Sequence, residues 1–214
     1  MYNLCAWMKD IGCFVVCIGL ATSAIARTME EIVDAMVGTI FVSPHVESAD
    51  GALTACGLEF TAIQRDFSTR NGAPVKINGS FYFRRTQPTS VFYALKLSVI
   101  DNLGASETFT APANGFIRAP RGVAPIKAIR ANSDNAGYAL FMGALDKPVL
   151  AAYEEILRSN KIQIGFNRRP GQQDVVTTLD LTVVDTKIVG DEVVRRRSND
   201  MVDEFKDCVG LLVK

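Results

Sequence analysis

Two alternating runs of apolar and polar residues lie close together in the sequence and constrain the fold more than any other feature. The first spans residues 75–84 and the second spans residues 91–99. Side chains of a strand point alternately to its two faces, so each run predicts a strand with one buried face. Only a short polar segment containing Pro88 separates the runs. The pair therefore predicts a β-hairpin.

Three further segments predict strands of the same kind. Residues 53–62 alternate, with Cys56 on their apolar face. Residues 161–168 and 174–185 are apolar runs joined through Pro170-Gly171. Proline presets one turn dihedral and glycine accepts a positive one, so this dipeptide indicates a second hairpin.

The remaining regions between helices are less regular. Residues 39–51 begin with an apolar run and continue as a polar segment that contains His45, which predicts a surface loop. Prolines interrupt residues 111–137. Because proline removes a backbone donor, we expect short edge strands and loops there. Residues 138–143 predict one more buried strand.

Three segments have the apolar periodicity of amphipathic helices: residues 28–38, 146–160 and 199–213. Thr28 and Glu31 have the spacing of a capping box at the start of the first. Asp146 can cap the second, and Pro148 suits its first turn. Strands that outnumber helices in this way predict an α+β fold, mainly antiparallel and sandwich-like, with about three peripheral helices. We expect one domain over residues 27–214.

The N-terminus predicts a signal peptide over residues 1–26. Lys9 precedes an apolar segment that starts at Ile11, and Ala24 and Ala26 have the small-residue spacing of a cleavage site. The alternative is a retained membrane anchor, but the apolar segment is shorter than the ~20 residues that a spanning helix needs. Cleavage after Ala26 predicts a periplasmic or secreted protein. The rest of the chain has no segment long and apolar enough to span a membrane.

Removal of a signal peptide would leave two cysteines, Cys56 and Cys208. Cys208 shares a predicted helix face with Met201, Phe205 and Leu212, so both cysteines lie on apolar faces. An even cysteine count in an exported chain favours a Cys56–Cys208 disulfide. Two free buried thiols are the main alternative. A catalytic or metal-binding cysteine is disfavoured because there is no C-x-x-C pair.

Charge and motifs exclude several function classes. The chain has 23 Lys and Arg against 23 Asp and Glu, a balance that argues against nucleic acid or an anionic membrane as partner. No phosphate-binding glycine motif and no G-x-S-x-G nucleophile motif occurs. One histidine cannot form a multi-histidine zinc site. We assign no catalytic residue, metal or cofactor.

The remaining candidate residues are His45, several carboxylates and several arginines. His45 lies near Ser43, Glu47 and Asp50, but catalytic triads are assembled from distant segments, so this proximity is weak support. Carboxylates within or beside predicted strands are Glu59, Asp66, Asp101 and Asp180.

Arginines recur at the predicted hairpins and could form one cationic patch if the hairpin ends meet. They are Arg84, Arg85, Arg168 and Arg169, with Arg195, Arg196 and Arg197 after the last predicted strand and Arg118, Arg121, Lys127 and Arg130 in the proline-rich region. The alternative is solvated charge that protects sheet edges.

These observations favour an exported, non-enzymatic binding or accessory domain whose partner is a protein or a small anionic ligand. One alternative is a secreted hydrolase that uses carboxylates with or without His45. Another is a binder of anions or acidic partners that uses the hairpin arginines.

Overall fold

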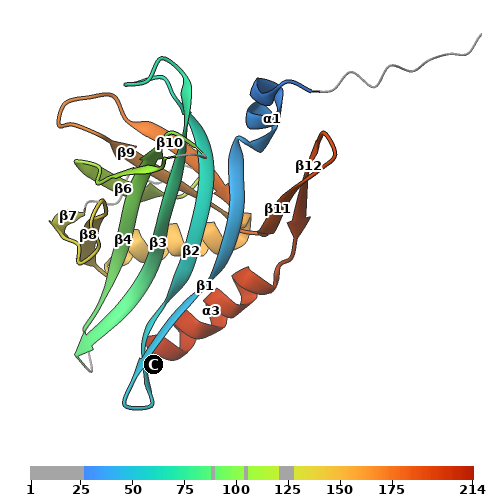
Figure 1. Cartoon of the computed structure of the whole chain (residues 1–214). Coiled ribbons are helices and arrows are strands. Elements are labelled where there is room, and N and C mark those ends of the chain that lie inside the picture. Colours follow the sequence, from blue (N-terminus) through green and yellow to red (C-terminus); the bar gives the residue numbers. More distant parts are fainter. Residues whose placement is uncertain (1–26, 88–89, 104–105, 121–127) are drawn as a thin grey trace, which may run out of the picture.

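The two alternating runs form the centre of a large antiparallel sheet (Figure 1). The computed structural model describes residues 27–87, 90–103, 106–120 and 128–214. The runs are strands β3 (Ala73–Gln87) and β4 (Ser90–Asp101), paired so that Ser80 lies opposite Lys96. The predicted signal peptide, residues 1–26, lies outside the described residues.

The large sheet has seven strands in the order β1-β2-β3-β4-β8-β7, with β5 also paired to β4. Its other members are β1 (Gly38–Ala49), β2 (Ala52–Asp66), β5 (Thr108–Thr110), β7 (Ile129–Asn132) and β8 (Ala139–Ala144). Every pair is antiparallel.

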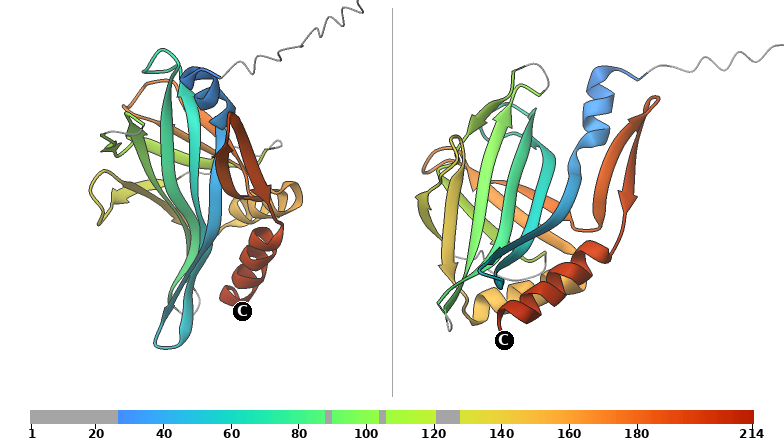
Figure 2. Two further views of the ribbon diagram at one scale, coloured as in Figure 1. Left: turned by 45° about the vertical axis from the view of Figure 1, so that its right-hand side comes forward. Right: turned by 60° about the horizontal axis from the view of Figure 1, so that its bottom comes forward.

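A smaller sheet covers one face of the large one (Figures 1 and 2). It has the order β10-β9-β6, with β6 (Asn114–Arg118), β9 (Lys161–Asn167) and β10 (Val175–Asp180). A Cβ added at Gly115 would lie 2.6 Å from the Phe141 ring, which shows how closely β6 approaches the large sheet. The apolar faces of both sheets form one hydrophobic core, as a sandwich requires.

Three helices complete the described residues: α1 (Met29–Met36), α2 (Lys147–Ser159) and α3 (Asp200–Leu212). Thr28 and Glu31 form the predicted capping box of α1, and the Asp146 carboxylate accepts a hydrogen bond from the Val149 backbone N–H at 3.0 Å. Helices α2 and α3 lie beside each other (Figure 2). Tyr153 of α2 packs edge-on against Phe205 of α3, with ring centroids 5.4 Å apart.

The disulfide between Cys56 and Cys208 joins α3 to β2, with the two Cα atoms 5.7 Å apart. The prediction of a mainly antiparallel, sandwich-like α+β fold with three helices and this bond is therefore confirmed. The buried stripe of α3 differs from the predicted one: Val202 and Val209 are buried with Phe205 and Leu212, while Met201 and Cys208 are half-buried.

The predicted loop around His45 is wrong, because residues 38–49 form the continuous strand β1. The outward positions of β1 are mostly polar, so the segment resembles a loop in sequence. Pro44 is accommodated because β1 is the outermost strand of the sheet on that side.

The single strand predicted over residues 174–185 is also wrong. Strand β10 ends at Asp180, whose carboxylate accepts hydrogen bonds from the backbone N–H and hydroxyl of Thr182 at 3.0 and 2.6 Å. This side-chain turn starts a new strand. Strand β11 (Val183–Val189) pairs with β12 (Glu192–Arg197), so Arg195 to Arg197 lie on a strand that the sequence pattern did not reveal.

None of the helices within the described residues is long and apolar enough to cross a membrane.

Candidate functional site

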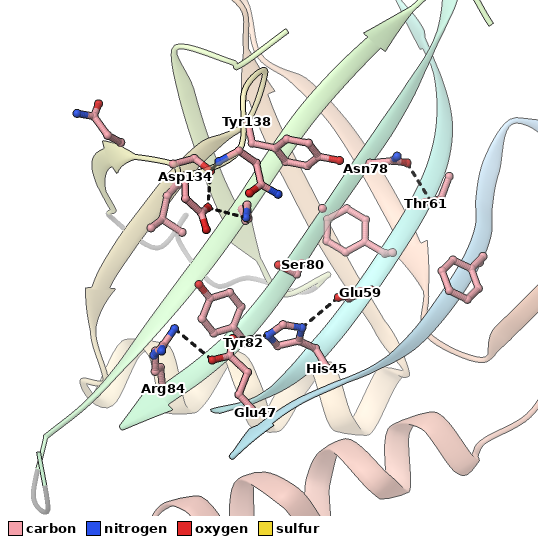
Figure 3. Close-up of a pocket in the computed structure, with 18 residues that line it drawn as sticks. His45, Glu47, Glu59, Thr61, Asn78, Ser80, Tyr82, Arg84, Asp134 and Tyr138 are labelled. Carbon is pink, nitrogen blue, oxygen red and sulfur yellow. Dashed lines mark hydrogen bonds and ion pairs between the residues drawn. The ribbon is translucent and has the colours of Figure 1, made fainter. Parts of the chain in front are cut away.

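A cavity of about 520 Å³ lies on the outer face of the large sheet, opposite the core (Figure 3). We call it the basin. Strands β1 to β4 supply most of its lining, and the segment between β7 and β8 supplies one wall. Side-chain alternation explains its polarity: residues such as Phe81 and Phe83 point into the core, so Ser80, Tyr82 and Arg84 point outward.

Gly57 permits the first contact in the basin. The strand register places His45, Gly57 and Tyr82 in one row across β1, β2 and β3. A Cβ at Gly57 would lie 2.3 Å from the Cβ of Tyr82, so no larger residue fits there unless its surroundings move. Because glycine leaves this space open, the His45 and Tyr82 rings meet above it, with centroids 5.0 Å apart.

In an adjacent row of residues, a small alanine on β2 likewise leaves space for its two neighbours to meet. Glu47, Ala55 and Arg84 lie side by side on the three strands. The small Ala55 side chain allows an ion pair between Glu47 Oε2 and Arg84 Nη1 at 3.3 Å.

His45 is held between two carboxylates. Its Nδ1 lies 3.1 Å from Glu59 Oε1 and its Nε2 lies 3.0 Å from Glu47 Oε1. A neutral imidazole has one N–H and can donate to one carboxylate, whereas a protonated imidazole donates to both. In a nucleophile–base–acid triad, one ring nitrogen faces the nucleophile. In this structure both nitrogens contact carboxylates, so neither nitrogen faces a nucleophile.

The opposite wall comes from Lys96 and the segment before β8. Lys96 Nζ lies 3.0 Å from Asp134 Oδ1 and 5.6 Å from the centroid of the Tyr138 ring. The hydrogen bond and the charge of Lys96 hold the pKa of the Asp134 carboxyl below its usual value.

Neutral polar groups line the centre of the basin together with the Glu59 carboxylate. Figure 3 shows Ser80 near the centre, with Tyr82, Glu59, Asn78 and Tyr138 around it. Asn78 accepts a hydrogen bond from the Thr61 hydroxyl at 3.0 Å through its amide oxygen, and its NH₂ group has no acceptor among the described residues. The Ser80 hydroxyl has no side-chain partner among the residues that the structure describes.

Two of the candidate carboxylates, Asp66 and Asp101, lie away from the basin in a buried ion-pair cluster. Arg168 Nε donates to Asp66 Oδ2 at 3.0 Å, and Arg168 Nη2 donates to Asp101 Oδ1 at 2.8 Å. Burial acts to raise the pKa of the Asp66 carboxyl, but hydrogen bonds from Thr69 and Arg168 outweigh it and lower the pKa. Arg70 adds a second cation at Asp101, at 3.1 Å. These carboxylates are therefore committed to structural partners.

Asp180 has a comparable role at the end of β10. Burial acts to raise its pKa, and hydrogen bonds from Thr182 and Arg197 outweigh that effect and lower it. Of the four carboxylates singled out in the sequence, only Glu59 lines the basin.

The structure does not bring the four hairpin arginines together. Arg84 lines the basin, and Arg85 donates to the Leu212 carbonyl at the end of α3. Arg168 contacts Asp66, which pairs with Ala73, eleven residues before Arg84 on β3. That separation corresponds to roughly 36 Å of strand. A single anion site that contains all four arginines is therefore excluded.

The other arginines also have separate surroundings. Arg195 donates to the carbonyl oxygens of Ala35, Val37 and Thr39, and so ties β12 to α1 and β1. Arg118 donates to the Gln163 side chain at 2.7 Å. Arg121 and Lys127 lie outside the described residues.

Sequence reasoning singled out His45, Glu47, Glu59 and Arg84, but missed their association and the opposite wall. One signal was available: a glycine inside a predicted strand often marks a close approach of neighbouring groups, and Gly57 is such a glycine. Lys96 and Asp134 carry no comparable signal, since their meeting depends on the β4–β8 pairing.

Comparisons with known proteins give no assignment: no family model, curated protein or solved structure matches this chain. Within residues 27–87, 90–103, 106–120 and 128–214, no group of three or more His, Cys, Asp or Glu side chains is arranged to hold a metal ion.

Proposed function

We propose that this chain is an exported, non-enzymatic binding domain that holds a small polar ligand in the basin. The observation that carries the proposal is the state of His45, whose two ring nitrogens both contact carboxylates. A general base needs a free ring nitrogen that faces a nucleophile or a water molecule. The His45 arrangement instead fixes a set of oriented polar groups, which is what a binding site needs.

The other acidic candidates support binding rather than hydrolysis. Asp66 and Asp101 are ion-paired to Arg168, and Asp180 contacts Thr182 and Arg197. A carboxylate that acts as a general acid needs a raised pKa, whereas the pKa values of Asp66 and Asp180 are lowered.

Export is proposed from two features. Ala24 and Ala26 have cleavage-site spacing behind an apolar segment. The disulfide between Cys56 and Cys208 suits an oxidising compartment.

The test is a screen of small polar molecules by amide chemical shifts in two-dimensional NMR spectra of the isotope-labelled protein. We expect shift changes at Asn78, Ser80, Tyr82 and Lys96. A Glu59→Gln substitution should weaken the binding, while Glu154→Gln, an exposed change on α2, should not.

Two results would contradict the proposal. The first is binding whose shift changes map away from the basin, for example to the groove that α2 and α3 line around Tyr153 and Val209. The second is turnover of an ester, peptide or glycoside that the Glu59→Gln change abolishes and Glu154→Gln leaves intact.

A further inference from the structure

We infer that the ligand of the basin is a neutral polyhydroxylated molecule of the saccharide class, and not an anion. The inference rests on the proposed function, since it names the class of ligand for the same site. Three properties of the basin support it: paired cations, mixed hydrogen-bonding groups and aromatic side chains in its lining.

The charges come first. Each cation in the basin already has a carboxylate partner: Arg84 has Glu47 and Lys96 has Asp134. An anionic ligand at either cation would lie close to that carboxylate, and the two like charges would repel each other. Glu59 adds a third carboxylate, which no lysine or arginine contacts among the described residues. The basin therefore disfavours an anion, which argues against the small anionic ligand that the sequence suggested.

Hydroxyl groups suit a site in which carboxylates and cations lie next to each other. A hydroxyl both donates and accepts, so one hydroxyl can bridge a carboxylate and an ammonium or amide group. Glu59 has a side chain that is 53% exposed and uses one oxygen, Oε1, for His45. Ser80 on β3 lies opposite Glu59 on β2 and opposite Lys96 on β4. The row across these strands thus places a hydrogen-bond acceptor (Glu59), a hydroxyl (Ser80) and a donor (Lys96) side by side.

The third property is apolar surface beside the polar groups. Tyr82 packs with Ala55 and Ala94 in a small apolar cluster on the outer face, with Leu140 and Met142 against it. The Tyr138 ring lies across the basin. A sugar ring has C–H faces that pack on aromatic rings while its hydroxyls bond at the edges. A volume of about 520 Å³ is within the size range of small-molecule sites.

The experiment titrates the disulfide-bonded protein, residues 27–214, with glucose, galactose, mannose, N-acetylglucosamine and their disaccharides. Glucuronate, glucosamine and inorganic phosphate serve as charged probes. Binding is measured by calorimetry and located by amide chemical shifts of the isotope-labelled protein, at about 0.02 M and about 0.3 M salt. We expect a neutral saccharide to bind with an affinity that salt leaves unchanged, and glucuronate to bind at least about tenfold more weakly.

Substitutions assign the binding to the basin. Ser80→Ala removes a hydroxyl that has no side-chain partner in the described residues, so it should leave the thermal unfolding midpoint unchanged and weaken saccharide binding roughly tenfold. Tyr138→Ala should weaken it by a similar factor through lost ring contact. Glu154→Gln on α2 is the matched control and should have no effect.

The outcomes separate the two proposals. If glucuronate or phosphate shifts the basin amides and no neutral saccharide does, the ligand class is wrong and the proposed binding function stands. If no probe of any charge shifts the basin amides, both are wrong. If a neutral saccharide binds but Ser80→Ala and Tyr138→Ala have no effect, the inference about this site is overturned.

Discussion

Gly57 determines what the outer face of the large sheet can hold. A Cβ there would lie 2.3 Å from both the Phe81 carbonyl oxygen and the Tyr82 Cβ. We expect Gly57→Ala to destabilise the protein by about 1–3 kcal/mol, since β3 would have to shift. At the size of this domain each kcal/mol lowers the unfolding midpoint by roughly 2–4 °C, which circular dichroism measures.

Gly210 provides the matched control for this prediction. It lies inside α3, and a Cβ added there would meet nothing within 4 Å. Gly210→Ala should stabilise the protein by up to about 1 kcal/mol, because alanine favours the helix. Equal effects of the two substitutions would show that the close approach at Gly57 is unimportant.

Asp66 predicts a dependence of stability on pH. Its pKa in the folded protein is lowered from 3.8, so the ionised form stabilises the fold. That stabilisation is complete above the unfolded value and is lost as the pH falls through the lower folded value. We expect the free energy of unfolding, measured with urea, to decrease below about pH 4.

Asp66→Asn should make the free energy of unfolding decrease less steeply below about pH 4. At neutral pH it should also cost about 1.5–3 kcal/mol, because Arg168 would lose its charge-assisted hydrogen bond to Asp66 and keep only its pair with Asp101. Asp134→Asn is the control, since Asp134 is exposed and its ion pair contributes little. If Asp66→Asn leaves the pH dependence of the free energy of unfolding below pH 4 unchanged, Asp66 is not its source.

Among the elements, α3 depends most on a single covalent contact. Cys208 ties it to Cys56 across 152 residues of sequence. We expect the Cys56→Ala, Cys208→Ala double variant to lose at most about 5 kcal/mol of stability, the chain-entropy limit for a loop of this length. Hydrogen exchange measured by mass spectrometry should show the loss first in α3, and much less in β3 and β4. Uniform loss of protection across the sheet would mean that the bond does not act on α3 specifically.

Local sequence patterns predicted the elements that pack on the core. They failed for β1, whose outward residues are mostly polar, and for β10 and β11, which a turn separates. The β3–β4 hairpin and the caps of α1 and α2 follow from alternation and capping residues that lie close together in sequence. Strand β1 resembled a loop in sequence because its outward residues are mostly polar. Two of them, His45 and Glu47, line the basin. The basin itself depends on register between distant strands, and no single segment of the sequence contains that information.

At the scale of the whole molecule, the prediction concerns processing and oxidation. The proposed export predicts a mature protein whose mass corresponds to a chain that begins at Arg27. Its two cysteines should resist alkylation unless a reductant is added. Intact mass spectrometry before and after iodoacetamide treatment measures both. A retained N-terminus would contradict the signal peptide, and two alkylated thiols would contradict the disulfide.

The long span of the disulfide has a consequence for the order of events during synthesis. Cys56 leaves the ribosome well before Cys208, since 152 residues separate them. In the interval its thiol has no native partner, although strands β2, β3 and β4 are already available to pair. Cys56 is fully buried in the finished fold, so its oxidation must be coupled to the docking of α3. Oxidation therefore comes late, and a premature bond to another thiol would hold α3 away from the sheet until an exchange reaction released it.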